Sequence, residues 1–203
     1  MGERFVHPSA VVAAEAVVGE GTRIWHFCHV MAGARLGDEV VLGQNCFVAG
    51  RVTIGSGCRI QNNVSLYDGV ILEEDVFVGP SVVFTNVKRP RARFPRRDAF
   101  AETRIGAGAT LGANATIVCG VRVGRCAMVG AGAVVTSDVA DHALVVGAPA
   151  RPVGWVCRCG EALAPRAESR LEAGEGSSED RTWGCSACGR RLRESDVGLT
   201  EIT

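Results

Sequence analysis

Aliphatic residues, with one phenylalanine among them, recur at every sixth position along most of this 203-residue chain. The series runs through Val6, Val12, Val18, Ile24, Val30, Leu36, Leu42, Val48, Ile54, Ile60, Leu66, Leu72, Val78 and Phe84, then resumes at Ile105, Leu111, Ile117, Val123, Val129 and Val135. An α-helix repeats every 3.6 residues and a strand every 2, so a period of six fits neither element alone. It predicts a short strand and a turn, repeated as a solenoid, with the aliphatic side chain inside and glycine at the bend.

The composition favours many thin layers over one bulky core. The chain is 47% hydrophobic but 5% aromatic, and it contains 26 glycines, which suits stacked layers of Val, Ile, Leu and Ala. A formal net charge of zero argues against a nucleic-acid partner, and no apolar run approaches the roughly 18 residues of a membrane span. Nine cysteines, an odd number, and the lack of a visible secretory signal predict a reducing, cytoplasmic setting.

The six-residue pattern resembles the hexapeptide-repeat acyltransferases, whose chains coil as a left-handed parallel β-helix with three hexads in each turn. The resemblance implies an all-β fold in which residues 18 apart stack one strand spacing, roughly 4.8 Å, from each other. We therefore expect a β-helix over residues 1–156, interrupted by one inserted loop at 85–104, and a Cys-rich tail over 157–203.

Stacking at this interval sorts polar side chains into columns. His26, Gln44 and Asn62 fall in one column, and Asn45 and Asn63 fall in the next. Such amide ladders either saturate one another within the solenoid or form a hydrogen-bonding wall for a polyhydroxylated ligand. Their nearness to the interruption favours the wall, so we predict that these residues contact a substrate.

The interruption itself is rich in positive charge. Within "FTNVKRPRARFPRRDAFAETRIG", residues 84–106, the basic residues are Lys88, Arg89, Arg91, Arg93, Arg96, Arg97 and Arg104. Arginine pairs with carboxylates and phosphates through two parallel hydrogen bonds, and two prolines stiffen the segment. We predict a lid that binds an anionic substrate, chiefly through Arg91 and Arg96; a basic insertion that only aids solubility is the alternative.

Several longer stretches narrow the resemblance. "GTRIWHFCHVMAGARLG", "QNNVSLYDGV", "VFVGPSVVFTNV", "IGANATIVCGV" and "VVGAPARPVGW" look like the nucleotide-amino-sugar N-acetyltransferases. They are most similar to those that acetylate the 3-amino group of UDP-2-acetamido-3-amino-2,3-dideoxyglucuronate. A related class acylates dTDP-3-amino-6-deoxyhexoses, and "FTNV" followed by a PR-rich loop favours the uronate class.

The resemblance implies a homotrimer with acetyl-CoA lying between neighbouring solenoids. Apolar residues at outward positions agree with such contacts; they are Phe47, Ile71, Phe77 and Val83. The positions expected to line the CoA are Gly112, Ala113, Gly130, Ala131, Gly147 and Arg151.

The same family places the asparagine of its "TN" pair beside the acceptor nitrogen, which here is Asn86. An amide cannot act as a base, but its carbonyl can accept a hydrogen bond from the amine and orient it. Many hexapeptide acyltransferases use a histidine instead, so His29, with His26, is the alternative. Asp68, predicted one turn below Asn86, could take the proton, and its neighbour Tyr67 joins the predicted substrate contacts.

Four cysteines in the tail have metal-ligand spacing. "CRCG" and "CSACG" supply Cys157, Cys159, Cys185 and Cys188 on either side of a polar stretch, residues 166–182, that we interpret as a linker. This arrangement predicts a small structural zinc ribbon; reduced, unliganded thiols are the alternative. Cys28, Cys46 and Cys58 sit at inward positions and are expected to be small core residues.

Two other functions remain open. A hexapeptide-repeat carbonic anhydrase needs histidines gathered at a trimer interface, and the candidates are His7, His26, His29 and His142. A non-catalytic, sugar-binding solenoid is the other hypothesis. Release of free CoA with a 3-amino nucleotide sugar distinguishes an acetyltransferase from both.

Overall fold

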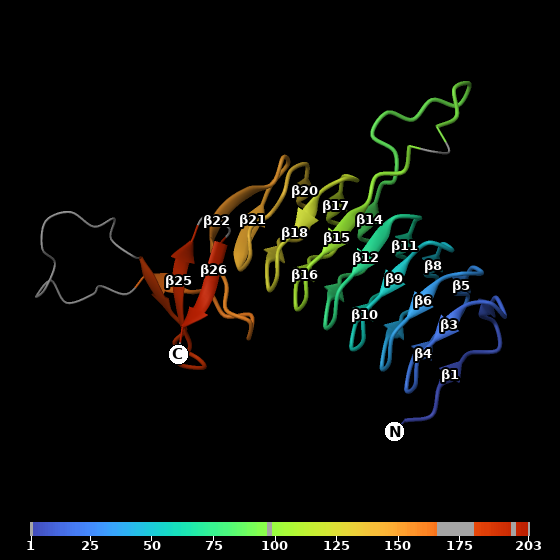
Figure 1. Ribbon diagram of the computed structural model, residues 1–203, viewed down its shortest axis with the longest axis horizontal. Coiled ribbons are helices and arrows are strands. Elements are labelled where there is room, and N and C mark those ends of the chain that lie inside the picture. The colour runs from blue at the N-terminus through green and yellow to red at the C-terminus, as the bar shows by residue number, and fades with distance from the viewer. Residues whose placement is uncertain (1, 97–98, 166–180, 196–197, 203) are drawn as a thin grey trace, which may run out of the picture.

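The computed structural model describes residues 2–96, 99–165, 181–195 and 198–202. Over those residues the chain forms strands, turns and bends without a helix, so no helix there could span a membrane. Strands of two or three residues recur every six residues and stack into three parallel sheets, which form the walls of a solenoid (Figure 1). The hexad prediction is confirmed.

Sheet A contains β1 Phe5–Val6, β4 Arg23–Ile24, β7 Val41–Leu42, β10 Arg59–Ile60, β13 Phe77–Val78, β16 Thr110–Leu111, β19 Met128–Val129, β21 Ala143–Val146 and β22 Arg151–Trp155. Sheet B contains β2 Val11–Val12, β5 His29–Val30, β8 Phe47–Val48, β11 Ser65–Leu66, β14 Val83–Phe84, β17 Thr116–Ile117 and β20 Val134–Val135. Sheet C contains β3 Val17–Val18, β6 Arg35–Leu36, β9 Thr53–Ile54, β12 Val70–Leu72, β15 Thr103–Ile105 and β18 Arg122–Val123. The turns between the sheets are named here the A–B, B–C and C–A corners.

The register between stacked strands is regular on both sides of the interruption. Before it, Ser65 pairs with Phe47, three hexads back along the chain. Across it, Val83 pairs with Thr116 and Phe77 pairs with Thr110, so the interval is longer by the same amount on both sheets. The interruption therefore lengthens one B–C corner and leaves the pairing of every sheet intact.

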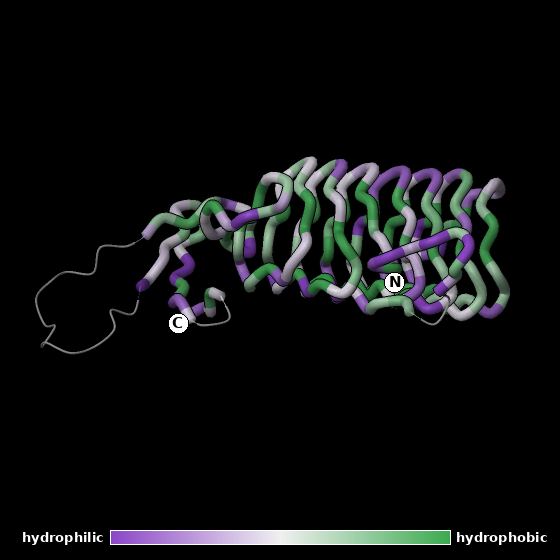
Figure 2. The backbone as a smooth tube through the Cα atoms, turned by 90° about the horizontal axis from the view of Figure 1, so that it is seen from above, coloured by the Kyte–Doolittle hydropathy of each residue, from purple (hydrophilic) through white to green (hydrophobic). Residues whose placement is uncertain are grey.

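The hexad side chains form the core. From Ile24 to Val135 every one of them is at most 2% exposed, and in Figure 2 hydrophobic segments recur at matching places in successive turns. Val6 is 37% exposed because no layer lies beneath the first turn. Cys28, Cys46 and Cys58 are buried in the same core, as predicted.

The inserted segment leaves the solenoid and projects away from it (Figure 1). Its boundary differs slightly from the prediction, because β15 begins at Thr103. Arg104 therefore belongs to a strand, where it pairs with Glu73 at 3.5 Å and Glu102 at 3.2 Å, and it is not part of the loop. Arg97 lies outside the described residues.

The solenoid ends in an antiparallel hairpin, β21 with β22. Beyond it a four-stranded antiparallel sheet D contains β23 Ala164–Pro165, β24 Thr182–Gly184, β25 Arg191–Ser195 and β26 Gly198–Ile202. The predicted linker was too long at its end, since Thr182 already starts a strand. Residues 166–180 of that linker lie outside the described residues.

Candidate active site

The predicted acceptor residues lie at the B–C corner, where the loop leaves the solenoid. The Asn86 carbonyl accepts a hydrogen bond from the Ala101 N–H at 3.1 Å, which closes the neck of the loop. Beside it, the Thr85 hydroxyl accepts from the Cys119 N–H of the next turn at 2.9 Å. Backbone contacts thus hold Asn86 at the mouth of the loop. Its side-chain amide is not needed for the described closure.

Asp68 occupies the same corner one turn earlier, but its described contacts run away from Asn86. One carboxylate oxygen accepts from the Arg51 N–H at 2.9 Å, and the other lies 3.7 Å from the Arg51 Nε. The Arg51 guanidinium also lies 5.6 Å above the Phe100 ring. Asp68 therefore caps the turn beneath it, and its role in taking a proton stays a prediction.

His29 points outward from sheet B and joins an aromatic path towards the B–C corner. Its ring lies 5.6 Å from that of Phe47, edge to face, and Phe47 lies 5.9 Å from Tyr67. On the same outer face, Val83 is 50% exposed and Val11 is 62% exposed. The outer face of sheet B thus combines one histidine with apolar and aromatic side chains that solvent reaches, which is typical of a binding surface.

The amide columns lie at the A–B corner and have a structural task there. The Gln44 N–H donates to the Asn62 Oδ1 at 2.9 Å, and the Asn45 side chain donates to Asn63 at 3.0 Å. Asn45 and Asn63 both have left-handed backbones, with φ of 59° and 61°, a conformation that asparagine tolerates better than most residues. These contacts explain the ladders as turn structure, and contact with a substrate stays a prediction.

The spacing of the columns does not predict a pair of histidines that lies at this corner. The His7 and His26 rings stack with centroids 3.6 Å apart, and Trp25 lies 6.2 Å from His26. His7 stands one position away from the column of His26 in the hexad register, so column spacing gave no signal. The pair does not support the carbonic anhydrase hypothesis, because His142 is not gathered with it. His142 is buried near the C-terminal end of the solenoid, where its Nδ1 lies 2.8 Å from the Val156 carbonyl oxygen.

Further along the A–B corner lie the residues predicted to line acetyl-CoA. The N–H groups of Gly112 and Gly130 already donate to the sheet, at 2.8 Å each. A Cβ on Gly112 would lie 2.5 Å from the Ala131 nitrogen, so this glycine permits close stacking of turns. The N–H groups of Ala113 and Ala131 differ: in the part of the chain described, neither has a hydrogen-bond acceptor. These two amides can donate to a ligand.

The terminal hairpin carries the other two predicted CoA contacts. Gly147 has a φ of 92°, a conformation suited to glycine, and its carbonyl accepts from the Val134 N–H at 2.9 Å. The Arg151 guanidinium donates to the neighbouring Ala150 carbonyl at 2.9 Å, and Arg151 is exposed. A guanidinium in this position can still reach a phosphate in solvent.

The described contacts of the loop arginines Arg91 and Arg96 do not reach the predicted acceptor residues. Arg91 and Arg96 are exposed, and the described polar contact of the Arg91 side chain is to the adjacent Pro90 carbonyl at 3.3 Å. The predicted lid thus extends outwards in this structure (Figure 1). A role over a substrate requires either closure or a neighbouring copy.

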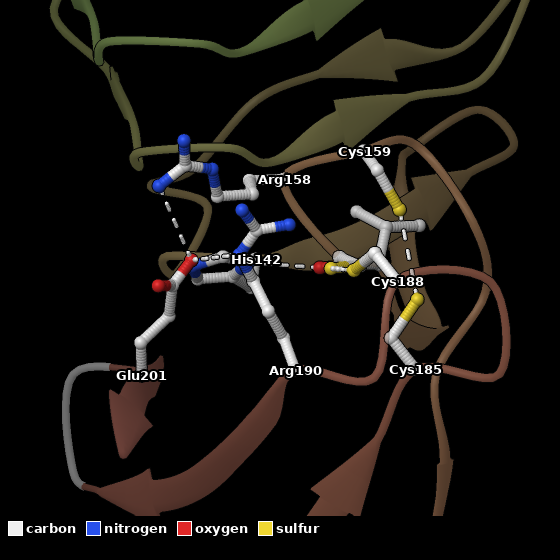
Figure 3. Close-up of polar contacts among 9 residues, drawn as sticks. His142, Arg158, Cys159, Cys185, Cys188, Arg190 and Glu201 are labelled. Carbon is white, nitrogen blue, oxygen red and sulfur yellow. Dashed lines mark hydrogen bonds and ion pairs between the residues drawn. The ribbon is translucent and has the colours of Figure 1, made fainter. Parts of the chain in front are cut away.

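The tail brings its four cysteines together, and they are named here the tail thiols. The sulfur atoms of Cys157, Cys159, Cys185 and Cys188 all lie within 4.8 Å of one another. The Cys157–Cys188 and Cys159–Cys185 sulfur distances are 3.5 and 3.6 Å (Figure 3). A hydrogen bond to the Cys188 sulfur raises the pKa of Arg190. Outside the tail, in the core of the solenoid, burial raises the pKa of the Cys58 thiol to about 11.

A large groove of the described structure lies at neither predicted corner. It has a volume of about 540 Å³ and runs between the C–A corner and sheet D, lined on one side by Asp75 and Arg125 and on the other by Arg158 and Glu201. Both signs of charge line it. The predicted acceptor and CoA residues lie instead on open corners of the solenoid.

The bacterial transferase hexapeptide family (six repeats) matches residues 15–50, 51–86 and 102–137, and the hexapeptide repeat of succinyl-transferase matches 33–68. The chain is 44% identical over 160 residues to dTDP-3-amino-3,6-dideoxy-alpha-D-galactopyranose 3-N-acetyltransferase of Aneurinibacillus thermoaerophilus, covering 76% of this chain and 80% of that protein.

Two solved structures are similar in fold. One is a hexapeptide-repeat acetyltransferase of Vibrio cholerae complexed with acetyl coenzyme A, with 28% identity and a TM-score of 0.54, covering 61% of this chain and 70% of that one. The other is PerB of Caulobacter crescentus in complex with CoA and GDP-perosamine, with 24% identity and a TM-score of 0.50. That match covers 75% of this chain and 58% of PerB, and it bears on the fold alone.

Proposed function

Because the chain belongs to the bacterial hexapeptide-repeat transferase family, we propose that it transfers an acetyl group from acetyl-CoA to the 3-amino group of a nucleotide-linked amino sugar. The observation that carries this proposal is the 44% identity to a dTDP-3-amino sugar 3-N-acetyltransferase across 76% of the chain. The acetyl-CoA complex of the Vibrio cholerae relative supports the choice of donor. Acetyl-CoA and the reduced thiols together favour a cytoplasmic enzyme.

The reaction needs little from the protein beyond positioning. The neutral amine attacks the thioester carbonyl, an N–C bond forms, and the C–S bond then breaks to release CoA as a thiolate. The amine loses one proton, which the thiolate, water or a nearby side chain can accept. Asn86 would hold the amine in line by accepting one of its N–H groups, and the N–H groups of Ala113 and Ala131 would hold the CoA arm. His29 is the alternative group for the proton.

The distribution of these residues favours a homotrimer. The predicted acceptor residues lie at the B–C corner, whereas the free amides for CoA lie at the A–B corner of the same chain, with sheet B between them. One chain alone does not bring the two sets face to face. A neighbouring solenoid packed against the exposed apolar face of sheet B would bring one chain's A–B corner towards another's B–C corner. Each active site would then use two subunits.

For the sugar, we favour a dTDP-linked 3-amino-3,6-dideoxyhexose, since that is the substrate class in the name of the 44% identical relative. A UDP-linked 3-amino uronate is the second candidate, supported by the basic loop with Arg91 and Arg96, which suits an additional carboxylate. The 3-amino group is common to both candidates.

The test is an assay of free CoA release with the purified full-length chain. The panel contains dTDP-3-amino-3,6-dideoxyhexoses, the UDP-3-amino uronate and their 4-amino counterparts, each with acetyl-CoA. We expect release with at least one 3-amino sugar and little with the 4-amino sugars. No release with any acceptor, while the sugars still bind by calorimetry, would support the sugar-binding solenoid instead.

A further inference from the structure

We propose that the tail thiols bind one structural Zn²⁺ ion, which folds the ribbon and fixes it to the end of the solenoid. The ribbon is defined as sheet D with the turns Cys157–Gly160 and Cys185–Gly189. Nothing in the proposed acetyl transfer requires this site, and its test is independent of that activity.

The sulfur distances match a tetrahedral metal site. With a Zn–S bond of about 2.3 Å, tetrahedral geometry places the sulfur atoms about 3.8 Å apart. The two shortest distances here are 3.5 and 3.6 Å, and all four sulfurs lie within 4.8 Å. A disulfide would need a separation of about 2.05 Å. Four thiolates converging on one point leave room for an ion among them rather than for two covalent pairs.

The two cysteine turns are built alike despite their different spacing. Each is closed by one hydrogen bond from the N–H of its first cysteine and one back to the carbonyl of that cysteine. The bonds are Cys157 N to Glu161 O at 2.8 Å, Gly160 N to Cys157 O at 2.8 Å, Cys185 N to Arg190 O at 2.9 Å and Gly189 N to Cys185 O at 3.0 Å. A glycine with positive φ ends both turns, at 91° and 72°. The extra residue of "CSACG" thus lengthens the second turn without changing its closure.

The ribbon has too small a core to be stable without further help. Among the described residues its buried core consists of Leu163, Leu192 and Leu199 with Cys157 and Cys185 themselves. Domains of this size need disulfides, a metal or a supporting surface. Two of the five core residues are the proposed ligands, so binding of the metal and folding of the ribbon would be one event.

The ribbon also rests on the solenoid. The Leu199 N–H donates to the Asp141 carbonyl at 3.2 Å, and the Trp155 and Trp183 rings meet edge to face at 6.3 Å. Next to the sulfurs, Glu201 lies 3.9 Å from Arg158 and 3.6 Å from Arg190 (Figure 3). Of the two arginines, Arg190 lies beside the Cys188 sulfur and offsets part of the net charge of −2 that four thiolates leave on Zn²⁺. Because these contacts depend on a folded ribbon, loss of the metal should release the ribbon from the last turns of the solenoid.

The donor set also defines the kind of site. Four thiolates in tetrahedral arrangement select Zn²⁺ or iron over hard cations, and they leave no open position for water or substrate. We therefore assign zinc a structural role. The ion should stay bound through turnover.

The experiment measures metal content in the full chain purified without chelator. We expect about one zinc per chain in the wild type, less than about 0.2 in the double variant Cys185→Ser/Cys188→Ser, and about one in the control Cys126→Ser, which removes a thiol outside the cluster. Tryptophan fluorescence should change in the double variant, because the Trp155–Trp183 contact depends on the ribbon.

A second measurement covers the case in which the double variant does not fold. Titration of wild-type protein with a mercurial reagent should release one zinc for every four thiols modified in the tail. Less than about half an equivalent of zinc, iron in its place, full zinc retained in the double variant, or disulfides among the tail thiols by mass spectrometry would each overturn the assignment.

Discussion

Removal of the Asn86 side chain tests how the acceptor amine is held. The structure separates the two possible effects of Asn86→Ala, because the loop neck is closed by the Asn86 backbone carbonyl and not by its amide group. The variant should keep its fold and assembly while losing one hydrogen bond to the amine. A neutral hydrogen bond contributes about 0.5–1.5 kcal/mol, rising to about 1.5–3 kcal/mol as the nitrogen gains positive charge. We expect kcat to fall at least about tenfold, or roughly 1.4 kcal/mol.

The assay is initial-rate release of free CoA with saturating acetyl-CoA, using the best acceptor from the sugar panel. Asn86→Asp should also lose at least about tenfold, and its pH–rate profile should move to higher pH, since a carboxylate beside the amine favours the protonated form. Sedimentation velocity and circular dichroism check that both variants assemble as the wild type does. Wild-type turnover in Asn86→Ala together with an inactive His29→Ala would refute the reasoning and assign the chemistry to the histidine.

Arg91→Glu or Arg96→Glu should raise the KM for an anionic substrate about tenfold or more through loss of a charge-assisted contact; unchanged kinetics would dismiss the lid. Asn45→Ala should lower the free energy of unfolding, measured with denaturant, by about 1 kcal/mol, because alanine tolerates the left-handed backbone less well, and Asn45→Gly should stay close to wild type. Unchanged stability of Asn45→Ala with a raised KM for the sugar would instead indicate that Asn45 contacts the substrate. Sedimentation should find a trimer, and a stable, active monomer would contradict the shared site. Because the pKa of folded Cys58 is about 11 against an ordinary 9.0, the unfolded chain loses this proton first. Stability should then fall above about pH 9, and less so in Cys58→Ala.

Much of the fold could be predicted because the hexad side chains obey a single requirement, burial in a stack of identical layers. The exceptions have physical reasons. Val6 keeps the spacing but lacks a layer beneath it, which the sequence period cannot reveal. For the amide columns, the sequence cannot distinguish a side chain that caps a turn from one that also binds a sugar, because both are equally polar; the structure shows the caps, and contact with a substrate stays a prediction. Another column of the solenoid has the same kind of cap. Asp38 accepts a hydrogen bond from the Glu20 N–H at 2.8 Å, and Ser56 accepts one from the Asp38 N–H at 3.1 Å.

The active site is harder to predict from one chain because the residues that define it lie on open corners. Charge pattern identified the loop, but it carries no information on the direction in which a segment leaves the solenoid. The four tail cysteines are the opposite case. The short spacing within each pair confines its two cysteines to one turn, so the sequence predicts which cysteines lie together. The structure adds that the sulfur atoms of both turns lie within 4.8 Å of one another.

The position of the loop also explains how such a solenoid can change substrate without losing its fold. The insertion lengthens the interval between paired strands equally on all three sheets, so the strands on its two sides keep the same register. Its two ends are even used by the next turn, because the Thr85 and Thr103 hydroxyls accept from the Cys119 and Gly120 N–H groups at 2.9 and 3.2 Å. A loop anchored this way can vary in length and charge while the strands above and below stay in register. We therefore expect the choice of nucleotide sugar to reside in residues 86–102, and transplanting this loop between two related enzymes should transfer acceptor preference with little effect on the KM for acetyl-CoA.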